Sequence, residues 1–250
     1  MVRPGWRIAS LLHDFSSNSI NRHFKKIVKD LEEPYVTIGL EMDKHDVSKE
    51  VIQKVKYSDK KALTVYGSGS YHHITYGLCK LANNISNNYT YIHIDHHNDY
   101  GSLERKLDCG SFVSSILNDK LAKDVIMIGC SHSEMSNFTD EWLIGKCGKP
   151  AIEDIILKSK CNNVYLSIDL DVMLDDEIST SPLYSRGRMT KGMLLEIIGT
   201  IKSMRTIISA DILGYSFSLF PSKRKKAMLL YEDIAKAILG EEEWQVCSKQ

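Results

Sequence analysis

The chain has 250 residues, which is enough for one α/β domain, and we expect a single domain over residues 1–250. Acidic and basic residues balance at 32 each, and no apolar run is long enough to span a membrane, so we expect neither nucleic acid nor a membrane as a partner. The six cysteines show no CxxC spacing, which argues against a disulfide framework and favours reduced thiols in a cytoplasmic protein.

Strand and helix patterns alternate along the chain. Most of the strand candidates are continuous apolar runs, which is typical of strands that helices cover on both faces of a parallel sheet. The expected fold is therefore an α/β three-layer α-β-α sandwich with a mainly parallel sheet. The predicted strands are 7–12, 35–40, 62–66, 89–94, 124–128, 164–170 and 206–213, and the predicted helices are 20–31, 48–56, 73–83, 111–119, 137–144, 190–203 and 223–239.

Two local features refine this outline. Thr190 precedes an apolar helical pattern and is a good N-cap for the helix that follows it. Residues 171–189 lack periodicity and contain Ser, Thr, Pro and Gly, which predicts a long loop. Loops of that length in compact domains are often functional.

Three clusters of histidine and acidic residues follow one another along the chain. The first is Tyr71-His72-His73, the second is DHHND at residues 95–99, and the third is SIDLD at residues 167–171. The second and third each follow an apolar run that predicts a buried strand, and ligands of open parallel sheets bind beyond the carboxyl ends of the strands. The clusters therefore indicate a binding site at one edge of the sheet.

The spacing within the clusters favours a site for cations. Side chains two residues apart on extended backbone point the same way, so Asp95, His97 and Asp99 can converge on one point and Asp169 with Asp171 on another. Paired carboxylates beside a buried strand repel each other unless a cation neutralises them. The alternative is a polar surface loop, and the second carboxylate cluster weighs against it because buried unpaired charge is costly.

The donor types narrow the choice of metal. Carboxylate oxygen and imidazole nitrogen without thiolate suit Mn²⁺, and suit Zn²⁺, Fe²⁺ or Mg²⁺ less well. Two such ions about 3.5–4 Å apart could share a water molecule, lower its pKa and direct it at a polarised carbon.

These residues resemble the motifs GGDH, DxHxD and SxDxD of the ureohydrolase superfamily, which includes arginase, agmatinase and formiminoglutamase. Residues 95–99 and 167–171 match the second and third motifs in full, and residues 69–72 resemble a degenerate first motif. The resemblance extends from about Ala62 to Leu213. It implies an arginase-like fold, two Mn²⁺ per chain and hydrolysis of a linear C–N bond in a small nitrogen-containing substrate. Ring-like oligomers are common among such proteins, so a homo-oligomer is also expected.

The resemblance also implies which residues bind the metal. Asp99 would in addition hold the activated water and pass its proton to the leaving nitrogen. The implied ligands of one Mn²⁺ are His72, Asp95, Asp99 and Asp169, and those of the other are Asp95, His97, Asp169 and Asp171.

Several positions depart from the family pattern. Ser70 and Tyr71 replace the second Gly and the Asp of the first motif, and Cys109 stands where many relatives carry a substrate-facing His. Gly214 stands where the guanidine-hydrolysing members have a recognition Glu. A guanidinium substrate would lose its charge-assisted bidentate anchor there, so we expect an amidine, guanidine-like or amide substrate other than arginine itself.

Three further residues leave alternatives open. Cys109 is either a small residue that lines the pocket or a nucleophile whose thiolate the metals stabilise. His132 is either the missing catalytic acid or base, or an ordinary loop histidine. His93 lies inside a predicted strand and is expected to be a packed, hydrogen-bonded histidine rather than a ligand.

Two other functions compete with a C–N hydrolase. The run Asp95-His96-His97 also resembles the DHH phosphoesterases, which use two manganese ions, but that interpretation leaves SIDLD unexplained and lacks the family's earlier DxD cluster and later glycine-rich region. The other alternative is a degenerate, arginase-fold protein that binds metal or ligand without turnover. The lost recognition Glu and the altered first motif favour it.

Overall fold

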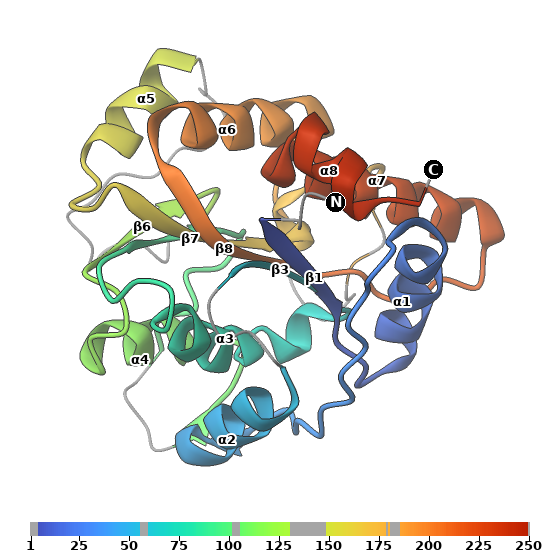
Figure 1. The fold of residues 1–250 in the computed structure, drawn as a ribbon, viewed down its shortest axis with the longest axis horizontal. Helices are drawn as coiled ribbons and strands as arrows, with labels where there is room; N and C mark the ends of the chain where they lie inside the picture. Colours follow the sequence, from blue (N-terminus) through green and yellow to red (C-terminus); the bar gives the residue numbers. More distant parts are fainter. Residues whose placement is uncertain are drawn as a thin grey trace.

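Six parallel strands form the central sheet of the computed structural model (Figure 1). The structure describes residues 5–55, 60–101, 106–130, 149–178, 180 and 186–249. The sheet order is β1-β3-β8-β7-β4-β6, so the chain crosses over the sheet several times. The strands are β1 (Trp6–Ser10), β3 (Lys61–Val65), β4 (Thr90–Ile94), β6 (Asp124–Ile128), β7 (Asn163–Asp169) and β8 (Thr206–Leu213).

Helices cover both faces of this sheet (Figure 1), which confirms the predicted three-layer α-β-α sandwich. One face packs against α1 (Phe15–Ile27), α5 (Lys149–Leu157), α6 (Lys191–Met204), α7 (Pro221–Leu239) and α8 (Glu241–Cys247). The other packs against α2 (Lys44–Lys54), α3 (Ile74–Ala82) and α4 (Phe112–Asn118). A short antiparallel pair, β2 (Met42–Asp43) with β5 (Lys106–Leu107), lies outside the main sheet.

The strands are apolar because helices bury both faces of the sheet. In β4, Ile92 and Ile94 belong to the core on one face of the sheet, whereas Tyr91 belongs to the core on the other. Successive side chains of a strand point to opposite faces, so a strand buried on both faces has no polar alternation. The continuous apolar runs therefore predict the sheet well.

Most predicted elements are confirmed, with ends that shift by a few residues. The strands 124–128 and 206–213 match β6 and β8, and Thr190 caps α6 as expected. Helix α1 begins at Phe15, five residues before its predicted start, because the Asp14 carboxylate accepts the Ser17 N–H at 2.7 Å and caps it. Helices α5 and α8 and the β2–β5 pair were not predicted, and the predicted helix 137–144 lies outside the described residues.

The predicted strand 35–40 is wrong. Only Tyr35 forms a bridge, to Leu12, and no ladder follows from it. Val36 and Ile38 are buried in the core on the α2–α3 face, so the apolar pattern reflects packing rather than strand pairing. Pro34 has no N–H to donate, which also limits pairing at this point.

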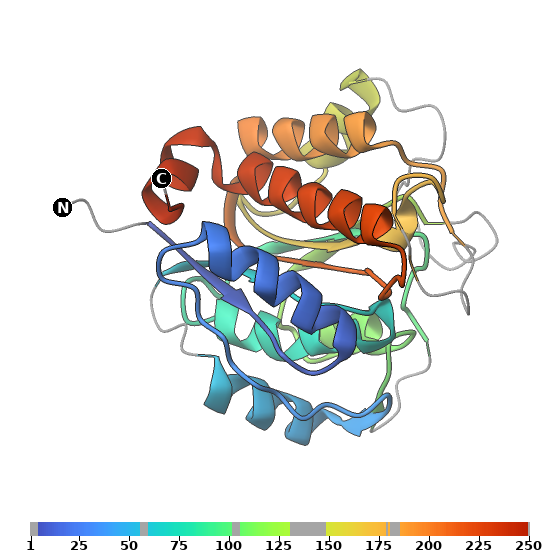
Figure 2. The same ribbon diagram turned by 90° about the vertical axis from the view of Figure 1, so that its right-hand side faces the viewer.

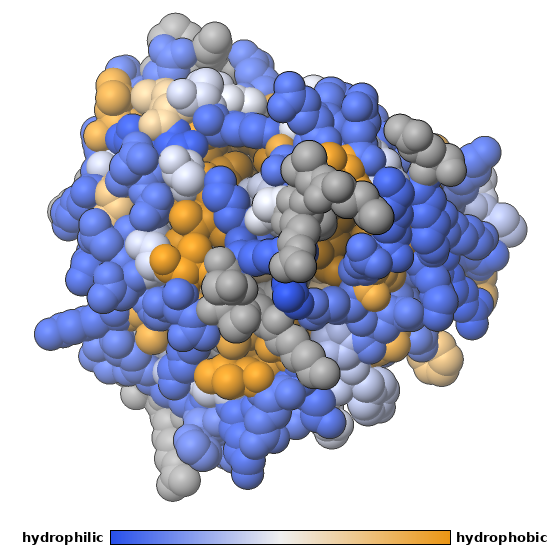
Figure 3. Space-filling view, viewed as in Figure 1, coloured by the Kyte–Doolittle hydropathy of each residue, from blue (hydrophilic) through white to orange (hydrophobic). Residues whose placement is uncertain are grey.

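The two edges of the sheet differ in character. In Figure 2 the strands run from left to right, so their carboxyl ends and the loops that follow lie at the right. At the edge where the strands begin, apolar surface gathers near the middle of the face (Figure 3). A cavity there has Lys202 and Arg205 in its lining, but both cations already bind helix-end carbonyls, those of Ala237 and Ile156.

Among the described residues, no helix combines the length and the apolar character that a membrane crossing needs.

The cap of α6 provides a test of the fold. Thr190 Oγ1 accepts the Met193 N–H at 3.2 Å. Thr190→Ala should lower the free energy of unfolding by about 1 kcal/mol because this N–H loses its partner, whereas Thr190→Ser should keep the cap. Urea denaturation measures both. An alanine variant as stable as the unaltered protein would contradict the assignment.

Candidate metal centre

The carboxyl ends of neighbouring strands bring the three clusters together. Asp169 is the last residue of β7, and Asp95 follows β4, the strand that pairs with β7. Asp171 lies in the short 3-10 helix η3 (Leu170–Val172). His72 follows the 3-10 helix η1 (Gly69–Tyr71), which begins after β3 with Ser68 as its cap.

The first group of donors surrounds one nitrogen of His72. Its Nδ1 lies 3.0 Å from Asp95 Oδ2, 3.1 Å from Asp99 Oδ2 and 3.6 Å from Asp169 Oδ2. The ring is completely buried, and its Nε2 lies 2.9 Å from Ser167 Oγ. Nδ1 itself has no hydrogen-bond partner. An unpartnered imidazole nitrogen among three carboxylate oxygens is a suitable donor set for a divalent cation.

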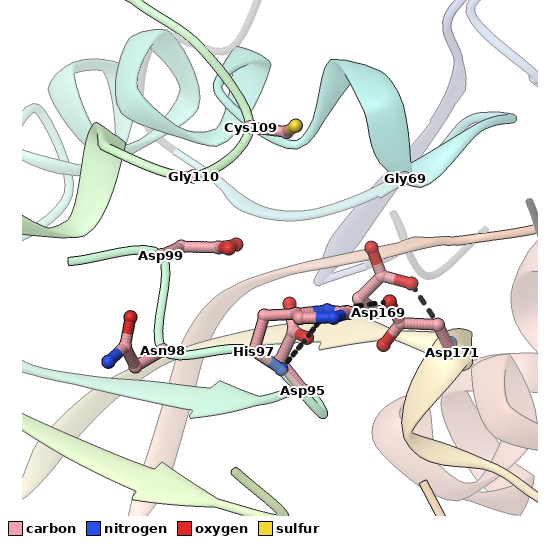
Figure 4. Close-up of a pocket in the computed structure, with 9 residues that line it drawn as sticks. All are labelled: Gly69, Asp95, His97, Asn98, Asp99, Cys109, Gly110, Asp169 and Asp171. Carbon is pink, nitrogen blue, oxygen red and sulfur yellow. Dashed lines mark hydrogen bonds and ion pairs between the residues drawn. The ribbon is translucent and has the colours of Figure 1, made fainter. Parts of the chain in front are cut away.

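The second group of donors shares Asp95 with the first. His97 Nδ1 lies 3.0 Å from Asp171 Oδ2 and 3.5 Å from Asp95 Oδ1 (Figure 4). Asp95 therefore presents one oxygen to each imidazole, as a carboxylate between two cations would. Asp171 Oδ1 accepts the His96 N–H at 3.3 Å, which fixes the third motif against the second.

The charge of this centre requires compensation. Four carboxylates lie together with exposed fractions of only 1% to 7%, and the described residues that line the pocket they face include no Lys or Arg. Burial and the neighbouring Asp95 charge raise the pKa of Asp99 to about 8 and that of Asp171 to about 7. Burial and Asp171 raise the pKa of Asp169 well above its usual value. Two divalent cations would supply the four positive charges that these groups lack.

The carboxylate charges also raise the pKa values of two imidazoles, those of His72 and His97, because they stabilise the protonated rings. Burial alone would lower the pKa of His97, but Asp171 and Asp95 outweigh it and raise the pKa to about 11. Asp95 and Asp99 likewise raise the pKa of His72 well above its usual value against the effect of burial. Protons would thus occupy these nitrogens where a cation is not bound.

A cavity of about 200 Å³ opens over these side chains (Figure 4). Cys109 projects from the wall opposite the carboxylates, and Asn98 points away from the centre. The Cys109 side chain is partly exposed and forms no disulfide with another described residue. Its place in the wall is as predicted. The other residues that line the cavity are Gly69, Asp95, His97, Asp99, Gly110, Asp169 and Asp171.

Two glycines pack directly on the Asp169 carboxylate. A Cβ at Gly69 would lie 2.5 Å from Asp169 Oδ2. Gly214 has φ +105°, and a Cβ there would collide with Asp169 Oδ1 and the Leu170 N–H. Both positions therefore require glycine for close approach, and Gly214 also has a backbone conformation that other residues rarely adopt.

The structure brings together all six of the residues predicted to bind metal, and it places Cys109 beside them. His132 lies outside the described residues. His93 is fully buried and hydrogen-bonded, and burial lowers its pKa to about 4, so the ring is neutral. The six residues predicted to bind metal are His72, Asp95, His97, Asp99, Asp169 and Asp171.

The sequence did not reveal the buried network behind His72. Ser167 lies between His72 and Asp211, a fully buried carboxyl group in the middle of β8. Tyr66 and Thr75 donate hydrogen bonds to Asp211. An acidic residue in an otherwise apolar strand was the available signal, because such a group is buried only with partners.

Comparisons with known proteins give a family match and similar folds for almost the whole chain. A model described as the Arginase family matches residues 12–239. The fold is similar to that of proclavaminate amidino hydrolase from Streptomyces clavuligerus, with 14% identity over 95% of this chain and 92% of that chain and a TM-score of 0.68. It is also similar to a hypothetical agmatinase from Burkholderia thailandensis, with 16% identity over 94% of this chain and 85% of that chain and a TM-score of 0.70. Arginase from Bacillus caldovelox is similar too, with 14% identity over 96% of this chain and 99% of that chain and a TM-score of 0.69. No curated protein matches the chain.

The raised pKa values predict how cation binding depends on pH. The folded state without metal holds protons on His97 (pKa about 11), Asp99 (about 8) and Asp171 (about 7) that the unfolded chain releases at lower pH. Its stability should therefore fall as pH rises from about 5.5 to about 8.5. Mn²⁺ should offset that loss, so the rise in Tm on adding Mn²⁺ should be larger at the higher pH.

Differential scanning calorimetry with and without Mn²⁺ measures this shift at both pH values. Asp95→Asn is the control, because it removes the shared ligand and should abolish the shift. An equal shift at both pH values would contradict the charge assignment.

Proposed function

The chain belongs to the arginase family, and on that premise we propose that it is a binuclear manganese hydrolase that cleaves a linear C–N bond in a small molecule. The observation that carries the proposal is the shared carboxylate, because Asp95 presents one oxygen to His72 Nδ1 and the other to His97 Nδ1. Each imidazole also faces a further carboxylate of its own, Asp99 or Asp171.

The residues present fit two manganese ions. The donors are carboxylate oxygens and imidazole nitrogens, a set that suits Mn²⁺, and the unpartnered His72 Nδ1 already faces three of the oxygens. Two Mn²⁺ held there would supply the Lewis acidity that activates a water molecule for attack on the carbon of the bond.

The chain's own residues would orient the reaction. With a cation on Nδ1, the His72 ring would carry its proton on Nε2 and donate it in a hydrogen bond to Ser167 Oγ, 2.9 Å away. Asp99 faces the cavity, and its carboxylate would hold a proton of the attacking water and deliver it to the leaving nitrogen. His132, in the segment after β6, remains a candidate for a second proton donor, and Cys109 lines the side on which substrate would lie.

The pocket favours a substrate without a guanidinium group. Every acidic residue in the described part of its lining belongs to the proposed ligand set, so none of these remains to pair with a guanidinium. Gly214 cannot supply one, because its Cβ position is filled by Asp169. We therefore propose an amide or amidine as the substrate class, with a guanidine-like compound as a weaker choice and arginine excluded.

The competing functions have less support. The family match includes the SIDLD cluster that a DHH phosphoesterase would leave unexplained, so that alternative is not favoured. An arginase-fold protein that binds metal or ligand without turnover would have the same six donors, so turnover with Mn²⁺ bound separates it from a hydrolase. A cytoplasmic location and a homo-oligomeric state remain predictions.

Loss of either shared ligand should abolish metal binding and activity. Asp95→Ala and Asp169→Ala each remove a carboxylate proposed to contact both cations, so manganese should fall from two ions per chain to nearly none. Asp46→Ala, at an exposed position on α2, is the control and should change neither. Elemental analysis after gel filtration and an ammonia-release screen over small nitrogen compounds measure the two effects. Full metal content with full rate in either variant would refute the site.

Arginine and agmatine should be poor substrates, and a glutamate at position 214 should not rescue them. Gly214→Glu should instead expel metal, because the new side chain displaces the Asp169 carboxylate. Gly199→Ala is the matched control, since a Cβ there meets no atom within 4 Å. Urea release and manganese content are the measurements. Efficient urea release from either compound by the unaltered protein would disprove the substrate argument.

A further inference from the structure

A third imidazole lies against the metal centre and belongs to none of the three motifs. His93 is in β4, two residues before Asp95, and is completely buried. Its ring stacks on the His72 ring with 5.1 Å between centroids and 24° between planes, and it meets Phe112 edge-on at 5.9 Å. His93 therefore packs directly behind the first proposed ligand.

The hydrogen bonds of His93 fix which nitrogen carries its proton. Nε2 lies 3.1 Å from the carbonyl oxygen of His97, which can only accept, so Nε2 is the donor. The same nitrogen lies 3.4 Å from Asp95 Oδ2 and 3.8 Å from Asp99 Oδ2, which are also acceptors. Nδ1 lies 3.2 Å from Tyr91 Oη and accepts from its hydroxyl.

This tautomer excludes His93 as a metal ligand. His72, His93 and Asp95 offer ligand atoms within 4.8 Å of one another, which by distance alone could hold an ion. The His93 nitrogen that faces the carboxylates carries a proton, however, and a metal needs its lone pair. The role of His93 therefore depends on the group to which its N–H donates.

The His93 N–H donates to the backbone of the turn that carries two proposed ligands, His97 and Asp99. The His97 carbonyl receives two donors, His93 Nε2–H and the Cys130 thiol, the latter at 3.1 Å. Two residues later Asp99 has φ 49°, in the left-handed region that few residues other than Gly, Asn and Asp adopt. Val113 donates its N–H to the Asp99 carbonyl at 3.1 Å and holds the far end of the turn.

This turn separates ligands of different cations. His97 faces Asp171, whereas Asp99 faces His72, so the peptides between them set the relative direction of the two side chains. A rotation of the His97 carbonyl would turn both away from their partners.

We propose that His93 is a positioning residue of the metal centre, which holds the His97 carbonyl so that His97 and Asp99 are directed at two adjacent cations. The inference rests on the proposed function. Residues of this kind affect metal affinity by roughly 10–100-fold.

His93→Phe and His93→Gln test it. Phenylalanine fills the space but cannot donate, so Mn²⁺ affinity by isothermal titration calorimetry should fall about 10–100-fold, with kcat reduced more than KM. The glutamine amide can donate from nearly the place of Nε2, so affinity should return to within about threefold of the unaltered protein. His73→Phe is the matched control, because His73 is equally buried and donates through Nε2 to the Gly39 carbonyl at 2.9 Å, away from the cavity. It should leave affinity unchanged.

The outcomes separate the two proposals. Unchanged affinity in His93→Phe, or glutamine as poor as phenylalanine, overturns the positioning role while the metal site stands. If the unaltered protein binds no Mn²⁺, both proposals fail. Should His93→Phe not fold, Cys130→Ala removes the other donor to the same carbonyl. A loss of several-fold in affinity then supports the role, and no loss overturns it.

Discussion

The repulsion between four carboxylates in one buried site is the main physical constraint on this structure. Their exposed fractions are 7% or less, and the described residues that line their pocket include no Lys or Arg and, as a cation, only the protonated His97. Burial, and then repulsion by the neighbouring carboxylates, raises the pKa values of three of them, Asp99, Asp169 and Asp171. Protonated His72 and His97 offset part of this charge, and two divalent cations would offset all four carboxylates in their ionised form.

The sheet explains how residues from distant parts of the chain reach this site. Strands β4 and β7 are neighbours, and their register pairs Ile94 with Ile168, so the next residues, Asp95 and Asp169, stand side by side. Strand β3 lies beyond β8, so the segment with His72 must pass over the end of β8 to reach them. Gly214 is at that end, where its N–H binds the Gly67 carbonyl and Asp169 occupies the space of its side chain. The position that would carry a recognition Glu is thus part of the packing around the metal centre.

The sequence predicted the residues of the metal centre better than the buried residues that pack around them. Asp95, His97, Asp99, Asp169 and Asp171 lie in short motifs at the ends of strongly apolar strands, where local spacing fixes how the side chains converge. The network behind His72 depends on contacts between residues far apart in the chain, such as Tyr66 with Asp211, and no local pattern encodes them. The false strand at 35–40 has the same cause, since burial of Val36 and Ile38 against a distant core resembles strand periodicity.

Anomalous diffraction at the manganese edge, from crystals grown with Mn²⁺, tests the central claim most directly. Our account predicts two peaks about 3.5–4 Å apart, one bound by His72 Nδ1 and the other by His97 Nδ1, with Asp95 bridging them. A single peak, or none, with the Asp95 carboxylate turned away from either imidazole, would contradict it.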